Sequence, residues 1–314
     1  MFGPICGRRD DLLRHAALSA VLLTALALVS FALPRALPGH PAETILFRLG
    51  VVPTPEAVRA FTEQAGLDRP LIAQFVAWIG RLAAGDWGQS LRGGEQVAAG
   101  LLERLPASLA IGAGGLALGA AMALALGFAA AAGNRPAESV SRGLALFAQA
   151  VPAFVAGLAA IHVFGVELRW IRPFGGGPLE RVLLPTALVA LYSAGALARL
   201  VALETRRAMA MPFFVAARAK GLSLGAALRG HAGPFGAIAL LAALRVEAAW
   251  VVGGTAVVEV LFATPGISAW MVDAIGDRDW PVLQAYLLLV GLWLIAVEAL
   301  SSMALTRLDP RRRP

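Results

Sequence analysis

Long apolar runs alternate with polar segments along the whole chain. A helix rises about 1.5 Å per residue, so roughly 20 predominantly apolar residues are needed to cross a hydrocarbon core about 30 Å thick. Six runs satisfy this requirement, and we predict that each forms a transmembrane helix. They cover residues 16–33, 106–132, 144–166, 182–200, 235–262 and 282–305.

One sizeable polar region, residues 34–104, lies between the first two runs. Within it, Thr54 suits the N-cap of a helix, Pro55 the first helical position and Glu56 the first turn. A second segment repeats apolar residues at helical spacing, so we expect a helix that lies on the outer membrane surface or against a neighbouring span. Its apolar positions are Leu71, Phe75, Trp78 and Leu82.

Composition agrees with this pattern. The chain is 58% hydrophobic and 15% charged, with a mean hydropathy of +0.72, which is typical of an integral membrane protein. The polar region is too small for a catalytic domain. We therefore predict three parts: a cytoplasmic N-terminus with the first helix (1–33), an extracytoplasmic region with amphipathic helices (34–104) and a core of five transmembrane helices (105–314).

The net charge of +7 is distributed by membrane side. Arginine-rich segments precede the first run, join the second run to the third and the fourth to the fifth, and end the chain. The remaining connections carry more balanced charge. The positive-inside rule then predicts that both termini and the loop 201–234 are cytoplasmic. An even number of spans agrees with this, because it puts both termini on the same side. In a soluble protein this charge would suggest nucleic acid, but here it indicates topology, and we expect no nucleic-acid partner.

Sequence signatures of catalysis are missing. There is no G-x-x-x-x-G-K-[ST] phosphate loop, because Lys220 precedes Gly221 outside any such frame, and there is no H-E-x-x-H metal motif. The residues around Ser268 do not form a G-x-S-x-G elbow, and the four histidines are scattered. We expect no catalytic residue, no metal site and no cofactor bound by this chain.

The loop sequence "FFVAARAKGLSLGAALRGH", residues 213–231, contains the single lysine of the chain, Lys220. Pro212 can begin a helix and Gly221 can end it, and a second short helix is expected over 224–229. The loop has small and cationic residues but no catalytic group. Two interpretations remain open on these grounds: an element held by another protein, or a basic loop that only enforces topology.

A resemblance favours the first interpretation. The segment "ARAKGLS", Ala217 to Ser223, resembles the cytoplasmic EAA loop of ABC importer permeases of the peptide/nickel group, dipeptide permease B subunits in particular. The similarity extends over nearly the whole chain in the same order. The other matching segments are "LPGHPA" (37–42), "LDRPLIAQFVAWIGRLAAGDWGQSLRGGEQV" (67–97), "RLPASL" (104–109), "VVEVLFATPGISAWMVDAIGDRDWPVLQ" (257–284) and "LDPR" (308–311).

The resemblance implies an all-α integral membrane protein with the type I ABC importer permease fold, six transmembrane helices and a cytoplasmic coupling helix. It implies a multi-pass subunit of the bacterial inner membrane that imports peptides, nickel chelates or a related small solute. The implied partners are a second permease subunit forming a hetero-dimer, two ATP-binding subunits, an extracytoplasmic substrate-binding protein and membrane lipid. ATP–Mg would be bound and hydrolysed by the partner ATPases, whose closure switches the path between inward and outward access.

By the same resemblance, the coupling helix docks on an ATPase. Four positions depart from the family pattern: Val215 replaces the glutamate of EAA, Pro212 a common acidic residue, His40 an aspartate and Phe235 an asparagine. The predicted docking residues are Ala216, Ala217, Arg218, Ala219, Lys220, Gly221, Leu222 and Ser223.

A charged residue inside a span costs roughly 2.5–3.5 kcal/mol and usually faces protein or water, and we consider four candidates. Arg245 and Glu247 point to opposite sides of one helix, so they should not pair with each other, and both are candidates for the substrate path. We interpret Glu259 as a structural or interfacial acid and Glu298 as a helix-packing residue.

Two other classes of protein are alternatives to an importer permease. A single-chain secondary transporter or channel would need broken helices or a proton relay near the midplane, and would not need the loop around Arg218–Gly221. An intramembrane hydrolase would need a nucleophile with a base, which the sequence does not supply. The binding-protein-dependent importer is therefore the favoured function.

Overall fold

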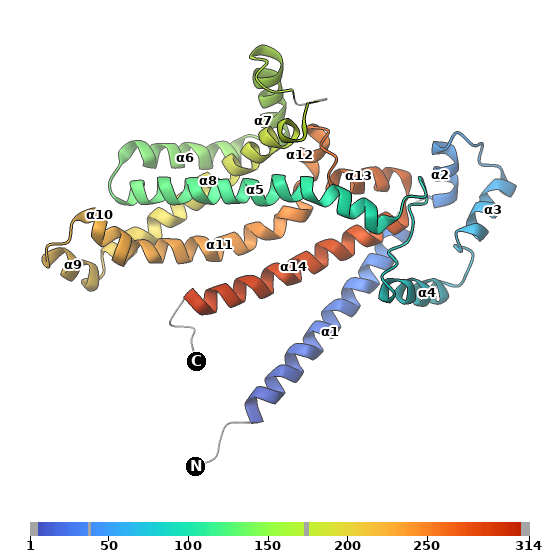
Figure 1. The fold of residues 1–314 in the computed structure, drawn as a ribbon, viewed down its shortest axis with the longest axis horizontal. Coiled ribbons are helices and arrows are strands. Elements are labelled where there is room, and N and C mark those ends of the chain that lie inside the picture. The colour runs from blue at the N-terminus through green and yellow to red at the C-terminus, as the bar shows by residue number, and fades with distance from the viewer. Residues whose placement is uncertain (1–5, 37–38, 173–175, 309–314) are drawn as a thin grey trace. The chain divides into compact units, whose positions relative to one another are not determined.

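The computed structural model describes residues 6–36, 39–172 and 176–308, and Figure 1 gives the order of the elements. Over these residues every regular element is helical, and the β-structure is limited to one isolated bridge between Gln89 and Gln96. The chain forms two compact units. The first consists of Met1–Glu103 and Met271–Leu292, and the second of Arg104–Trp270 and Trp293–Pro314.

The first unit begins with α1 (Cys6–Arg35) and three short helices, α2 (Pro41–Arg48), α3 (Pro55–Gln64) and α4 (Leu71–Ala83). The Thr54 hydroxyl accepts a hydrogen bond from the Ala57 amide at 3.2 Å, which confirms the predicted start of α3. His40 caps α2 in the same way, because its Nδ1 accepts from the Ala42 amide at 3.3 Å. The histidine thus serves as an N-cap where the family pattern has aspartate.

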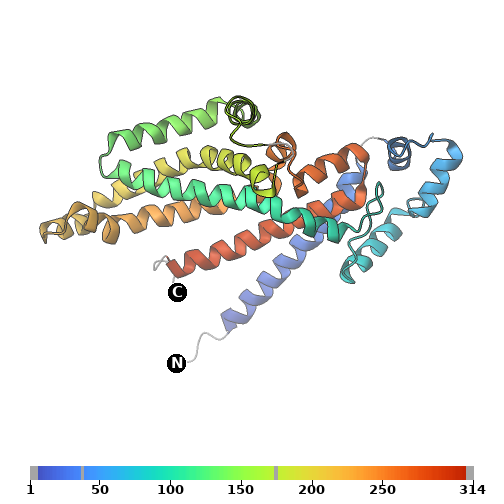
Figure 2. The same cartoon turned by 45° about the horizontal axis from the view of Figure 1, so that its top comes forward.

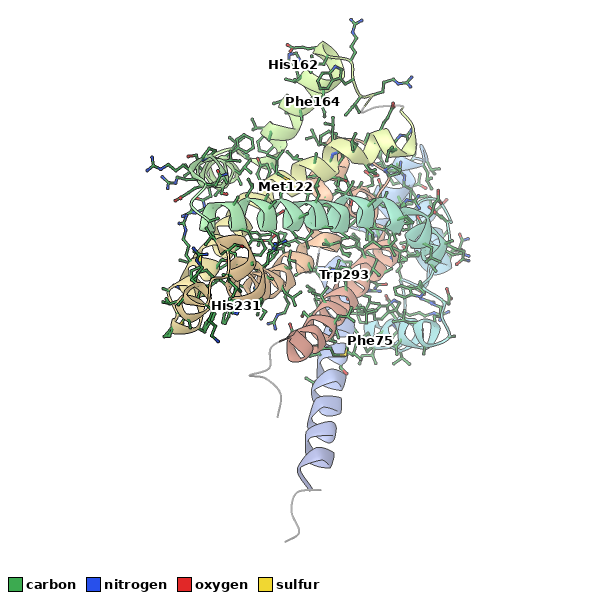
Figure 3. The ribbon with its side chains drawn as sticks, turned by 60° about the vertical axis from the view of Figure 1, so that its left-hand side comes forward. Phe75, Met122, His162, Phe164, His231 and Trp293 are labelled. Atoms are coloured by element: carbon green, nitrogen blue, oxygen red, sulfur yellow. The ribbon has the colours of Figure 1, made fainter. Side chains whose placement is uncertain are left out.

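Helix α4 packs against α1 through aromatic side chains. The ring centroid of Phe31 lies 5.1 Å from that of Phe75, which Figure 3 labels, and 5.7 Å from that of Trp78. Leu82 packs against the same cluster, whereas Leu71 is 63% exposed. The predicted contact of this amphipathic helix with a neighbouring span is therefore confirmed for three of its four apolar positions.

Polar contacts hold the Gly-rich turn at residues 85–94 of the first unit. The buried Asp277 carboxylate pairs with Arg48 at 3.3 Å and with Arg92 at 2.5 Å. The Asp279 carboxylate accepts from the Ser90 hydroxyl at 2.5 Å and from the Leu91 amide at 3.1 Å. Burial raises the pKa of Asp279, against the lowering effect of these hydrogen bonds.

The second unit is a bundle of long helices with shorter connecting helices, and Figures 1 and 2 show α5, α6, α8 and α11 running alongside one another. Small residues allow this close packing. A Cβ added to Gly195 of α8 would lie 2.3 Å from the Ala145 nitrogen of α6, and one added to Gly127 would lie 2.7 Å from the Cβ of Val201. The elements that lie wholly or partly in this unit are α5 (Val97–Ala131), α6 (Arg135–Ala150), α7 (Ala153–Ala160), a π-helix η1 (Ile161–Glu167), α8 (Pro178–Met209), α9 (Pro212–Ala219), α10 (Leu224–Ala227), a π-helix η2 (Leu228–Ala232), α11 (Gly233–Gly253), α12 (Ala256–Leu261), α13 (Ile267–Asp277) and α14 (Trp280–Leu308), and the residues of α5, α13 and α14 are divided between the two units.

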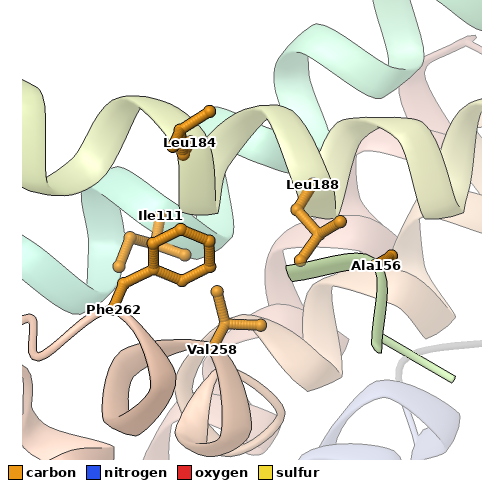
Figure 4. Packing of buried hydrophobic residues seen from close by; sticks show 6 residues of the cluster. All are labelled: Ile111, Ala156, Leu184, Leu188, Val258 and Phe262. Atoms are coloured by element: carbon orange, nitrogen blue, oxygen red, sulfur yellow. The ribbon is translucent and has the colours of Figure 1, made fainter. Parts of the chain in front are cut away.

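One apolar cluster joins α5, α7, α8 and α12 (Figure 4). The Phe262 ring, 1% exposed, lies at its centre beside Ile111 and Val258. Between transmembrane helices, such a cluster stabilises the fold through close van der Waals packing rather than through removal of apolar surface from water. The cluster consists of Ile111, Ala156, Leu184, Leu188, Val258 and Phe262.

Four helices of the described residues are long and apolar enough to cross a membrane. They lie where the second, fourth, fifth and sixth transmembrane helices were predicted. The apolar segment Val21–Arg35 of α1 is shorter than a span, and the predicted first span begins at residues whose side chains lie outside the description. The count of six therefore stays a prediction. The four helices are Val97–Ala131, Leu179–Met209, Leu224–Gly253 and Trp280–Ser301.

A single straight helix over residues 144–166 is wrong. The segment is a pair of helices, Arg135–Ala150 and Ala153–Glu167, bent by 108°. Val151 between them is extended, with φ −107° and ψ 120°, because Pro152 disfavours the helical conformation of the preceding residue and has no amide hydrogen to donate. The two halves together can still count as one bent span.

The predicted helix over residues 235–262 is also too long. Helix α11 ends at Gly253, and α12 begins separately at Ala256. Two consecutive glycines cost backbone entropy in a helix, and the Gly254 amide closes the last turn on the Trp250 carbonyl at 2.7 Å. The break puts Glu259 on a different helix from Arg245 and Glu247.

Candidate functional sites: an exposed helical loop and an acid-lined cavity

Helix α9 is a short rigid element with defined ends. Pro212 occupies its first turn, and its last turn closes with the Lys220 amide bonded to the Ala216 carbonyl at 3.0 Å. The chain then turns at Gly221, whose φ of 89° is a conformation that residues with a Cβ rarely adopt. The predicted start at Pro212 and stop at Gly221 are both confirmed.

The second short helix also begins at a side-chain cap. The Ser223 hydroxyl accepts a hydrogen bond from the Ala226 amide at 3.3 Å. Helix α10 covers Leu224–Ala227, and the chain continues through the wider turns of η2 to Ala232. The predicted helix over 224–229 is therefore present but changes its hydrogen-bonding pattern at Leu228.

Apolar contacts anchor the inner side of α9. Phe214 is 5% exposed and packs with Ala208 at the end of α8 and with Ala227 and Ala232. Phe213 stacks on Phe235 at the start of α11, with a centroid distance of 5.6 Å and an interplanar angle of 17°. These contacts connect the loop to the two transmembrane helices on either side of it.

The outer side of the loop is free of apolar packing. Arg218 donates a hydrogen bond to the Leu222 carbonyl across the turn, whereas the Lys220 side chain forms no hydrogen bond or ion pair with the described residues. Ala217 is only 5% exposed, so its methyl group is not on the outer surface, and Leu222 is half-buried. The exposed members of the predicted docking set are Ala216, Arg218, Ala219, Lys220, Gly221 and Ser223.

The two charged residues of α11 have different surroundings. Arg245 pairs with Glu298 of α14, with 3.2 Å between Nη1 and Oε1, so the expectation that it does not pair with Glu247 is confirmed. Nearby, the Trp293 indole, labelled in Figure 3, donates to the Ala248 carbonyl at 2.8 Å. Arg245 therefore takes part in the packing of α11 on α14.

Glu247 lines a separate cavity of about 430 Å³ between α5, α7, α8, α11 and α12. It is the one ionisable acid in the lining, which contains no basic residue. The Glu247 carboxylate forms no hydrogen bond or ion pair with the described residues. Glu247, Trp250 and Val251 recur at helical spacing in α11, so the sequence places these three residues on one face of that helix. The polar or aromatic lining residues are Tyr192, Ser193, Glu247, Trp250 and Thr255.

Glu259 is fully buried and hydrogen-bonded. Its carboxylate accepts from the Thr255 hydroxyl at 2.6 Å and from the amides of Ser268 and Ala269 at 2.9 Å each. It therefore satisfies the orphan amides at the start of α13, which confirms its interpretation as a structural acid.

The Ser268 hydroxyl is engaged as well, because it donates to the Val252 carbonyl at 2.8 Å. Nothing in these contacts resembles a nucleophile with its base. Within residues 6–36, 39–172 and 176–308, no three His, Cys, Asp or Glu side chains gather where they could hold a metal ion.

Comparison with known proteins gives consistent matches. The model of the binding-protein-dependent transport system inner membrane component family matches residues 116–314, and the model of its N-terminal part matches residues 10–112. A peptide transport system permease protein of Brucella abortus is 30% identical over 311 residues, covering 96% of this chain and 98% of the relative. A peptide ABC transporter permease protein of Sinorhizobium fredii is 29% identical, with the same coverage. The glutathione transport system permease protein of Escherichia coli is 28% identical over 278 residues, covering 88% and 90%.

Proposed function

This chain belongs to the family of binding-protein-dependent transport system inner membrane components and is a permease subunit of an ABC importer, in which we propose that residues 212–223 dock on an ATP-binding subunit. The observation that carries the proposal is the exposed, anchored helix α9 with its unengaged Lys220. Family membership replaces both the single-chain transporter and the hydrolase as interpretations of the sequence.

The loop has the mechanical properties that such docking needs. The hydrogen bonds within α9 resist deformation, so a force applied to the helix displaces it as a unit. Phe214 and the Phe213–Phe235 stack connect α9 to α8 and α11. Movement of α9 by an ATPase would therefore be transmitted to both transmembrane helices rather than absorbed in the loop.

The exposed surface of the loop also suits a protein partner. Val215 is 59% exposed, and beside it the small Ala216 and Ala219 allow close approach of another backbone. Arg218 and Lys220 add positive charge for an acidic groove. An apolar patch rimmed by charge is typical of a protein-binding surface.

The remaining subunits follow from this role. We propose that ATP–Mg is bound and hydrolysed by two separate ATP-binding subunits, that a second, different permease completes the path, and that an extracytoplasmic binding protein delivers the cargo. Both termini and the loop 201–234 would face the cytoplasm, as the arginine distribution predicts. Residues 34–104 would face the binding protein.

For the cargo, we propose a peptide-like solute. Two of the relatives above are named for peptide transport and one for glutathione, which is itself a small peptide. The earlier alternative of a nickel chelate has no comparable support among them.

Gly221→Val tests the docking element. A β-branched residue at φ 89° is strained by more than the roughly 1–2 kcal/mol that left-handed backbone costs an ordinary residue. We expect the variant to insert in the membrane and pair with the second permease, but to lose the ATPases when a tagged complex is purified, and to lose uptake.

Gly225→Val is the matched control. Gly225 lies in the same loop, and a Cβ there also meets open space, but its φ is not positive. We expect this variant to retain the ATPases. If Gly221→Val keeps the ATPases in full and transports normally, residues 212–223 are only a topological spacer.

A further inference from the structure

We propose that the Glu247 cavity is a transit site for a positively charged side chain of the solute, such as the side-chain ammonium of a lysine-containing peptide. The inference rests on the proposed function. It adds that the permease itself, and not only the binding protein, favours solutes with positive charge. It concerns the cavity of about 430 Å³ in the second unit, apart from the docking loop.

The first argument is charge. A carboxylate within a transmembrane helix is costly unless it is paired or faces water. Arg245 on the same helix is already paired with Glu298 at 3.2 Å. The cavity lining contains no Lys, Arg or His. Glu247 therefore lacks a counter-charge among the described residues, so a cation that enters the cavity would supply one.

The second argument is the hydrogen-bonding state of the other polar groups. The Tyr192 hydroxyl donates to the Val151 carbonyl at 2.6 Å, and the Ser193 hydroxyl donates to the Val189 carbonyl at 3.2 Å. The Thr255 hydroxyl donates to Glu259 at 2.6 Å. With their hydrogens engaged, these hydroxyls can act towards a solute only as acceptors. An ammonium group has three donors and no acceptor, so it complements such a lining.

The third argument is size and surface. Small-molecule sites commonly enclose about 300–1,000 Å³, and this cavity falls in that range. The aromatic faces of Tyr192 and Trp250 are suited to cation–π contact, and Trp250 is 67% exposed. Leu116, Leu188 and Val251 give the rest of the lining an apolar character that suits peptide side chains.

The test uses the complete transporter in proteoliposomes with one binding protein throughout. Uptake of lysyl-lysine and of glutamyl-glutamate is measured, and their ratio is compared between variants. The preference of the binding protein is common to all variants and cancels from this comparison. A defect in folding or ATPase coupling lowers both rates together, so it leaves the ratio unchanged.

Glu247→Gln should lower the lysyl-lysine to glutamyl-glutamate ratio by about tenfold, because a hydrogen bond to a charged group contributes about 1.5–3 kcal/mol. Glu247→Arg should lower it further, and Glu247→Asp should keep it near the wild-type value. The double variant Arg245→Gln/Glu298→Gln is the control, since it removes a whole ion pair outside the cavity without freeing Arg245, and it should leave the ratio unchanged.

The outcomes separate the two proposals. If the wild-type transporter takes up neither peptide, nor alanyl-alanine, the peptide function is overturned and this inference with it. If the wild type transports but all Glu247 variants keep the wild-type ratio, the peptide function stands and the cation site is overturned. A drop with the double variant Arg245→Gln/Glu298→Gln as large as that with Glu247→Gln would also overturn the site.

Discussion

Two turns of the second unit, each between short helices, differ in how their polar groups are satisfied. The α9–α10 turn bends at Gly221, with φ 89°, and the α12–α13 turn bends at Ala263, with φ 48°. Around the α12–α13 turn, Glu259, Thr264 and Ser268 are buried and hydrogen-bonded within the chain. Around the α9–α10 turn, the Lys220 side chain lies exposed and unengaged.

The difference separates a structural role from a docking role. A turn whose buried donors and acceptors all find partners stabilises its own chain and leaves little for another protein to bind. A turn that is rigid yet exposes cations and small residues gains nothing for its own fold from that surface. The α9–α10 turn is therefore the better docking element, and each prediction below tests one side of this contrast.

The largest effect is expected from Glu259→Ala. The substitution removes the acceptor of the Ser268 and Ala269 amides, and each buried donor left unpaired costs about 1–3 kcal/mol. We expect a strong loss of folded permease, measured as the thermal unfolding midpoint of the purified complex in detergent.

Glu259→Gln separates charge from shape in the same turn. It keeps the side-chain volume and one acceptor oxygen, so it should recover part of the lost stability. If Glu259→Ala unfolds at the wild-type midpoint, the carboxylate does not hold the α12–α13 turn, and the structural half of the contrast is wrong.

A smaller effect is expected from Lys220→Gln. An exposed ion pair contributes about 0.2–1 kcal/mol, so the affinity for the ATPases should fall by no more than about fivefold. The measurement is ATPase binding to the reconstituted permease pair at low and at high salt. The difference from wild type should shrink as salt screens the interaction. The unfolding midpoint should not change, because the Lys220 side chain is exposed and forms no hydrogen bond or ion pair with the described part of its own chain.

Local signals in the sequence predicted the ends of several elements correctly. Thr54 with Pro55 began α3, and Pro212 with Gly221 bounded α9, because capping and backbone geometry depend on a few neighbouring residues. Pro152 carried an equally local signal, but the apolar run around it hid the 108° bend. Hydropathy measures how apolar a segment is and contains no information on whether its helix axis is straight or bent.

The candidate sites show the same limit. Ala217 lies three residues after the buried Phe214, so helical spacing alone could have placed it on the inner side of α9. The surroundings of Glu247 could not be predicted in this way. They depend on Tyr192 and Ser193 of α8 and on the partner that Arg245 finds in α14, which only the packed structure brings together.

The smallest effect on transport is expected from Ala263→Gly, which should change only the stability of the fold. Alanine in the left-handed region costs roughly 1–2 kcal/mol, and glycine costs about 0.5–1 kcal/mol in backbone entropy. The difference favours glycine by at most about 1.5 kcal/mol, so the unfolding midpoint should rise slightly and uptake should be unchanged. The control is Ala216→Gly in α9, the same substitution at a helical position, where the midpoint should fall because only the entropy cost applies. Opposite signs would show that strain is stored at Ala263 and absent from α9. If the unfolding midpoint falls equally in both variants, no strain is stored at Ala263. The α12–α13 turn would then differ from the docking loop only in the burial of its polar groups.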